Sequence, residues 1–209
     1  MKTNSKHLGL VTKKFNEFFF VDLKNKENFG NSERFLCKVR KSINFKDQFI
    51  YVGDEVEIDN IDLTSKRAVI VSLKKRQNLL NRPSVANISN IYITFSVEEP
   101  KLNLSQVNRF LISAESMGVE VSLVLTKCDL ISDKKQIFLL DKFKKWGYQA
   151  IILNLYKSDH FEDLLAQLKK KKCSIFMGPS GVGKTTLLNK IIPGLQNSTA
   201  PVSNKIKRG

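Results

Sequence analysis

Apolar and polar residues alternate in short runs through the first 80 residues of the chain, and turn-rich pieces such as residues 25–32 separate the runs. A period of two is typical of strands that bury one face, because successive side chains point to opposite sides of a strand. We expect five strands, at residues 8–12, 17–23, 34–41, 54–58 and 67–73. Five short strands in succession predict a small OB-like barrel.

A dense cluster of charge followed by proline interrupts this pattern at residues 74–83. We interpret residues 1–76 as the barrel domain and residues 77–86 as a linker to a second domain. The basic cluster could be a solvated linker or could touch phosphate, and the sequence leaves both open.

From residue 87 onward, buried strands alternate with amphipathic helices. Strands are expected at residues 88–96, 119–125, 149–155 and 173–177, and helices at residues 104–117, 133–146 and 161–170. Gly118 and Gly147 stand where two helices would stop, and Asp133 is expected to cap the second helix. This alternation predicts a parallel sheet with helices on both faces, where ligands collect at the carboxyl ends of the strands. We therefore assign residues 87–209 to an α/β domain.

A glycine-rich segment joins the last of these strands to a further helical stretch that begins near Thr186. Its residues are Gly178, Pro179, Ser180, Gly181, Val182, Gly183, Lys184 and Thr185. This Gly-x4-Gly-Lys-Thr pattern is that of a phosphate-binding loop, in which successive backbone N–H groups converge on phosphate oxygens. We expect residues 178–186 to bind the nucleotide. Lys184 would stabilise charge on the terminal phosphates, Thr185 would ligate Mg²⁺, and these two residues would carry catalysis.

Thr126, Lys127, Cys128 and Asp129 follow directly after a predicted strand of the α/β domain. They resemble the Asn-Lys-x-Asp signature with which GTPases recognise guanine, with threonine in place of asparagine. A carboxylate at Asp129 can accept hydrogen bonds from N1–H and the 2-amino group of guanine, a donor pair that adenine lacks. Lys127 can lay its aliphatic stem along the base. Because this motif precedes the phosphate loop, the order is that of a circularly permuted GTPase.

The charge of the chain is strongly positive, since 35 basic and 20 acidic residues give a net charge of +15. Such an excess predicts a polyanionic partner, most simply nucleic acid, although a genome-wide lysine bias would give the same number. OB-like barrels bind oligonucleotides along one face. Phe18, Phe19 and Phe20 could place an aromatic ring on that face for base stacking, or could pack inside the barrel at alternate positions.

No apolar run approaches the ~20 residues that a membrane helix needs, and the basic N-terminus lacks the apolar segment of a secretory signal. We therefore expect a cytoplasmic protein without membrane contact. The three cysteines, Cys37, Cys128 and Cys173, show no C-x-x-C spacing, which argues against a disulfide framework or a zinc cage and favours reduced thiols.

Several of these segments together resemble the ribosome small-subunit-dependent GTPase A family over essentially the whole chain. They are the barrel segment Val52-Gly53-Asp54-Glu55-Val56, residues 81–87, the Thr126–Asp129 motif, the phosphate loop with its preceding strand, and residues 200–209. The resemblance implies a circularly permuted, Mg²⁺-dependent GTPase that cycles between GTP and GDP. It also implies stimulation by the small ribosomal subunit, a role in late maturation of that subunit, and contact of the barrel with ribosomal RNA. We expect the protein to be a monomer.

Members of the family continue past the equivalent of Gly209 into a threonine-bearing switch, an Asp-x-x-Gly motif and a zinc-binding helical domain. These features are not in the 209 residues. We therefore expect a GTPase domain that is incomplete at its C-terminus, no ligand domain for the Zn²⁺ of the family, and better support for nucleotide binding than for hydrolysis. Asn154 and Leu155 stand where the family has a Ser-Ala pair whose backbone helps to hold guanine.

Two other functions stay open from the residues alone. One is an ATP-dependent P-loop enzyme, in which Asp129 is an incidental turn residue. The other is a nucleic-acid-binding module with a catalytically impaired nucleotide pocket.

Overall fold

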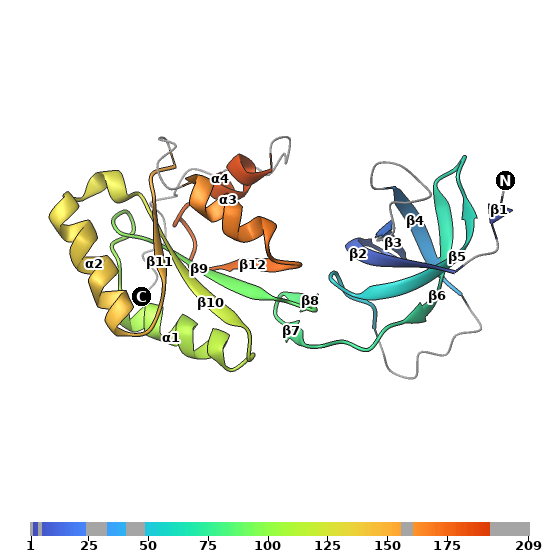
Figure 1. Cartoon of the computed structure of the whole chain (residues 1–209), viewed down its shortest axis with the longest axis horizontal. Coiled ribbons are helices and arrows are strands. Elements are labelled where there is room, and N and C mark those ends of the chain that lie inside the picture. Colours follow the sequence, from blue (N-terminus) through green and yellow to red (C-terminus); the bar gives the residue numbers. More distant parts are fainter. Residues whose placement is uncertain (1, 4–5, 24–32, 41–48, 156–160, 193–209) are drawn as a thin grey trace, which may run out of the picture. The chain divides into compact units, whose positions relative to one another are not determined.

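The structure is a computed structural model that describes residues 2–3, 6–23, 33–40, 49–155 and 161–192 (Figure 1). It divides into two compact units, Met1–Ile88 and Ser89–Gly209. The turn expected at residues 25–32 and the family-like segment at residues 200–209 lie outside the described residues.

The first unit is a closed five-strand barrel, as the alternating pattern predicts. Its strands are β2 (His7–Phe15), β3 (Phe18–Leu23), β4 (Arg34–Val39), β5 (Glu55–Asp62) and β6 (Arg67–Leu73), with β1 (Lys2–Thr3) beside β5. They pair in the order β5-β2-β3-β4-β6, and pairing of β5 with β6 closes the circuit. All of these pairs are antiparallel except β4 with β6.

The barrel interior is filled by every second residue of these strands. In β3, Phe19, Val21 and Leu23 are buried, whereas Phe18 and Phe20 are half-exposed. Phe35, Val56, Ile58 and Ile70 have no exposed surface. Burying one such side chain contributes about 1.5–3 kcal/mol, so this alternation is what stabilises the unit.

We expect residues 79–86 to be part of a linker. In the structure they form a short hairpin that belongs to the barrel unit. Its strands are β7 (Leu79–Asn81) and β8 (Ser84–Ala86). The Ala86 N–H donates to the Val52 carbonyl at 2.8 Å, and the Asn87 side-chain amide donates to the Gly53 carbonyl at 2.9 Å. The hairpin is thereby fixed to the barrel loop that precedes β5.

A buried ion pair holds the chain that leads into this hairpin. The Arg76 guanidinium donates to both carboxylate oxygens of Asp54 at 2.7 Å, and Asp54 has no exposed surface. Asp54 also accepts from the Tyr51 N–H at 2.8 Å, and the guanidinium lies 4.9 Å from the centre of the Tyr51 ring. Two-point pairing of this kind restricts geometry strongly, so it sets the course of the segment after β6.

The second unit is a parallel sheet with helices on both faces (Figure 1). Its elements are β9 (Asn90–Ser96), α1 (Leu104–Glu115), β10 (Glu120–Thr126), α2 (Asp133–Lys145), β11 (Ala150–Leu153), α3 (Phe161–Lys169), β12 (Ser174–Met177) and α4 (Lys184–Ile191). The strands lie in the order β11-β10-β9-β12. Every residue of β9 is buried, which is typical of a central parallel strand.

Two helix boundaries of this unit depend on polar residues. Asn103 caps α1, because its side chain accepts from the Gln106 N–H. The prediction that Asp133 caps α2 is wrong: Ser132 occupies the cap position and Asp133 is the first helical residue, where its charge still complements the helix dipole. The cysteines are free, as expected, and Cys37 and Cys128 are buried.

Gly53 provides a test of the hairpin contact. Its φ is +89°, and an added Cβ would lie 2.0 Å from the Ala86 carbonyl oxygen. Gly53→Ala should lower the free energy of unfolding by about 2–3 kcal/mol, measured by urea denaturation with the amide signals of the substituted unit as the probe. Gly118→Ala is the control, because Gly118 has φ +64° but no atom within 4 Å of the added Cβ. An equal loss in both variants would show that backbone conformation, and not the hairpin contact, decides the cost.

Candidate nucleotide-binding site

The phosphate-loop pattern lies where the sequence places it, between the end of β12 and the start of α4. The loop itself is residues 178–183. At Gly178 a Cβ would lie 2.0 Å from the Thr94 carbonyl oxygen on β9, so only glycine allows the loop to leave the sheet here. Val182 points into the core and is buried, which anchors the middle of the loop.

Lys184 lies at the first position of α4 and turns back over the loop. Its ammonium group donates to the carbonyls of Gly178, at 2.8 Å, and of Pro179. Burial lowers the pKa of Lys184, because the charged form loses hydration there. A phosphate group beside this ammonium would offset that loss, so the site favours an anion.

Thr185 and Thr186 follow Lys184 in the first turn of α4. Thr185 is half-buried and Thr186 is exposed. A threonine hydroxyl is the kind of hard oxygen ligand that Mg²⁺ accepts, and Mg²⁺ usually takes its remaining ligands from water and substrate phosphates. No group of three or more His, Cys, Asp or Glu that could hold a metal occurs among the described residues. The Thr185 hydroxyl therefore fits a magnesium ion that arrives with a nucleotide.

The Thr126–Asp129 motif lies at the carboxyl end of β10. Lys127 has φ +57°, and a 3₁₀ turn follows at Cys128–Leu130. Thr126 is fully buried, and its hydroxyl donates to the Val182 carbonyl at 2.6 Å. The two motifs recognised in the sequence are therefore in direct contact across 56 residues of chain.

The rest of the turn is also held by neighbouring atoms. The Lys127 ammonium donates to the Glu99 carbonyl in the loop after β9. The Cys128 thiol donates to the Leu125 carbonyl at 3.2 Å. Burial raises the pKa of Cys128 to about 12, so the thiol stays neutral and acts as a packing residue.

A hollow of about 200 Å³ opens between the two motifs. It is lined by Glu99, Lys127, Asp129, Leu130, Leu155, Gly183 and Thr186. Asp129 is exposed to solvent and Leu155 forms an apolar wall, which suits a flat heterocycle with hydrogen-bond donors at one edge. The structure thus brings the Thr126–Asp129 motif and the phosphate loop together around one hollow.

Three of the lining residues were not predicted to bind the nucleotide: Glu99, Leu130 and Leu155. A signal for Glu99 was present, because Glu98, Glu99 and Pro100 follow the carboxyl end of β9, where ligands of parallel sheets collect. By the family resemblance, Asn154 and Leu155 stand where relatives have a Ser-Ala pair. Leu155 lies beside Gly183, because a Cβ added to that glycine would be 3.1 Å from the Leu155 Cδ1.

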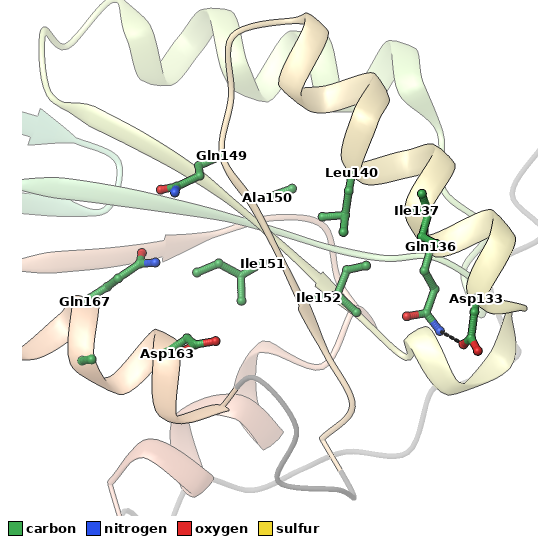
Figure 2. Close-up of a pocket in the computed structure, with 11 residues that line it drawn as sticks. Asp133, Gln136, Ile137, Leu140, Gln149, Ala150, Ile151, Ile152, Asp163 and Gln167 are labelled. Atoms are coloured by element: carbon green, nitrogen blue, oxygen red, sulfur yellow. Dashed lines mark hydrogen bonds between the residues drawn. The ribbon is translucent and has the colours of Figure 1, made fainter.

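A larger hollow, of about 650 Å³, opens between α2 and α3 beside β11 (Figure 2). None of the residues predicted to bind the nucleotide lines it. The larger hollow is therefore not the place where the two motifs meet.

Comparison with known proteins agrees with this geometry. The sequence model of the family described as RsgA GTPase matches residues 73–209. The small ribosomal subunit biogenesis GTPase RsgA of Prochlorococcus marinus (strain NATL1A) is 38% identical over 213 residues, with 99% of this chain and 68% of that protein covered. The same-named protein of Parasynechococcus marenigrum (strain WH8102) is 33% identical over 205 residues, with 98% and 68% covered.

Two solved structures share the fold. YjeQ from Thermotoga maritima superposes with a TM-score of 0.80 at 31% identity, covering 91% of this chain and 66% of that one. YloQ, described as a circularly permuted GTPase, gives a TM-score of 0.74 at 25% identity, covering 88% and 64%. The chain spans about two thirds of the length of these relatives.

The contact between the two motifs can be tested by changing Thr126. Thr126→Val keeps the shape but leaves the buried Val182 carbonyl without its donor, which should lower the free energy of unfolding by about 1–3 kcal/mol. Urea denaturation followed by the fluorescence of Trp146, the one tryptophan of the chain, would measure this loss in the second unit. Thr126→Ser retains the hydroxyl and should lose less. If valine and serine cost the same, the hydrogen bond contributes nothing.

Proposed function

The chain belongs to the RsgA GTPase family, and we propose that it binds GTP in the hollow beside Asp129, hydrolyses it to GDP and phosphate, and assists late maturation of the small ribosomal subunit. The observation that carries this proposal is the hydrogen bond from Thr126 to Val182, because it joins a base-binding motif to a phosphate loop. Neither motif alone would distinguish this function from that of other P-loop proteins.

The phosphates would lie over residues 180–184 at the start of α4, where backbone N–H groups and the helix dipole favour negative charge. Lys184 would release the carbonyls of Gly178 and Pro179 and place its ammonium against the terminal phosphates. Thr185 would hold Mg²⁺, which when bound neutralises charge on the phosphate oxygens. Catalysis in this class depends on positioning and charge, so we propose slow intrinsic turnover that the ribosomal subunit accelerates.

The base would enter beside Leu155 with its hydrogen-bonding edge toward Asp129. Asp129 would accept from N1–H and the 2-amino group of guanine. Lys127 would cover one face of the base with its methylene groups, because its ammonium is already held by the Glu99 carbonyl. Thr126 would not touch the base, since its hydroxyl proton is given to Val182.

The barrel would contact ribosomal RNA through the face that carries β2, β3 and β4. Lys38 lies 4.6 Å from the centre of the Phe18 ring, and Lys13 lies 5.9 Å from that of Phe20. These two rings are half-exposed, and Phe15 on β2 is 60% exposed. Cations next to accessible aromatic rings suit single-stranded RNA, because the cations can contact its phosphates while the rings stack on its bases.

We further propose that the protein acts as a monomer in the cytoplasm, where its proposed partner, the ribosomal subunit, is assembled. None of the helices described in the structure has the length and apolar character to span a membrane.

Asp129→Asn tests base recognition. The asparagine oxygen still accepts from N1–H, but its NH2 group faces the 2-amino group, and two donors cannot bond to each other. GDP binding should therefore weaken by about tenfold or more, while ADP binding stays within about twofold. Xanthosine diphosphate has a carbonyl at that position and should bind the variant better than it binds the wild type. Titration with fluorescent analogues in Mg²⁺ would measure all three. Equal affinity of the wild type for GDP and ADP would favour the ATP-dependent alternative.

GTP turnover with and without purified small ribosomal subunits tests the enzymatic part. We expect stimulation by the subunit that falls when Lys13 and Lys38 are both changed to glutamine. A matched control changes Lys144 and Lys145 on α2 to glutamine, which alters the net charge equally. If both double variants lose stimulation alike, general charge and not the barrel face recruits the subunit. Salt-sensitive RNA binding that ignores GDP and GTP analogues would favour the impaired binding module.

A further inference from the structure

The turn that carries Asp129 has a backbone conformation that needs support. Lys127 adopts φ +57°, in the left-handed region, which is unfavourable for a residue with a Cβ. Such a conformation persists only where neighbouring contacts hold it. Thr126 and Lys127 are held by Val182 and Glu99 on the side of the phosphate loop and β9. The other side of the turn, after Asp129, needs a separate support.

Gln136 of α2 provides contacts on that side. Its side-chain amide nitrogen lies 3.0 Å from the Cys128 carbonyl oxygen and 3.4 Å from that of Ile131. These two carbonyls flank Asp129 and Leu130 in the chain, so one amide group spans the turn. A primary amide has two N–H donors, which is the number that this bridge requires.

The segment after Asp129 also makes two backbone bonds of its own. Within it, the Leu130 N–H donates to the Lys127 carbonyl at 3.1 Å and the Ile131 N–H donates to the Cys128 carbonyl at 3.3 Å. Both bonds are local and neither ties the turn to a neighbouring element. Gln136 does so, because it belongs to the 13-residue helix α2, whose Leu139 and Phe143 are buried.

The place of Gln136 in the fold is visible from the large hollow, which it lines (Figure 2). It extends from the first turns of α2, where Asp133 of the same helix lies 3.5 Å from its amide nitrogen. Gln149, which directly precedes β11, and Gln167 of α3 line the same hollow (Figure 2). No bond from Gln167 to the Cys128–Ile131 turn occurs among the described residues, so Gln167 serves as a matched control.

We propose that Gln136 is a positioning residue for guanine selectivity: it clamps the turn from α2 so that the Asp129 carboxylate faces the base hollow. The proposal rests on guanine binding at Asp129, as argued above. It predicts an effect on the base and not on the phosphates, because the phosphate loop is held by Lys184, Val182 and β9 independently of α2. A glutamine that merely stabilised α2 would affect both nucleotides equally.

Gln136→Leu and Gln136→Glu both remove the two donors, the first with an apolar and the second with a charged side chain. In each variant the affinity for fluorescent GDP should fall about tenfold, as expected for a bond of about 1–1.5 kcal/mol, while ADP affinity stays within about twofold. Gln167→Leu should change neither. A parallel fall for GDP and ADP, or no change, would overturn the proposal.

A double-mutant cycle with Asp129→Asn separates a positioning role from an independent one. If Gln136 acts through Asp129, then Gln136→Leu should weaken GDP binding in the wild type but hardly at all in the Asp129→Asn background. Additive losses would contradict the proposal. If the wild type shows no preference for GDP over ADP, the proposed function fails first, whatever the variants do.

The wild-type protein gives a measurement that does not depend on the folding of any variant. Saturating GDP should slow amide hydrogen exchange at Leu130 and Ile131 and shift the NMR signals of the Gln136 side-chain amide. Saturating ADP should do neither, because adenine offers Asp129 no matching donors. The same response to both nucleotides would refute the clamp.

Discussion

The site depends on one buried hydrogen bond, from the Thr126 hydroxyl to the Val182 carbonyl. Thr126 ends β10 and has no exposed surface, so water cannot replace either partner. Leaving such a carbonyl unpaired costs about 1–3 kcal/mol, which is large beside the total stability of a domain. The bond therefore fixes the distance between the base motif and the phosphate loop before any nucleotide arrives.

The parallel sheet explains why the chain order of the two motifs matters little. In the sheet order β11-β10-β9-β12, the strands that precede the two motifs, β10 and β12, both lie beside β9. Since all three run parallel, their carboxyl ends meet at one edge, and the loops that follow them enclose one hollow. A base motif that comes first in sequence can therefore face a phosphate loop that comes later.

Different physical terms dominate the two units. The barrel is stabilised by alternate apolar side chains, and its outer face is left to lysines that lie over aromatic rings. A surface of that kind suits long-range attraction to a polyanion. The α/β unit instead positions a few polar groups through buried strands, and it is there that single hydrogen bonds have the largest consequences.

Most of the elements and both motifs could be predicted from the sequence. Period-two alternation placed the barrel strands, helical periodicity placed α1, Gly147 marked the end of α2, and the Gly-x4-Gly-Lys-Thr pattern placed the phosphate loop, because each is a local property of adjacent residues. The sequence did not predict that Thr126 bonds to Val182, that Gln136 spans the turn after Asp129, or that residues 79–86 form a hairpin against Gly53. These contacts join residues whose surrounding sequence does not indicate the partner. They arise from how packed elements approach one another, which a one-dimensional pattern does not encode.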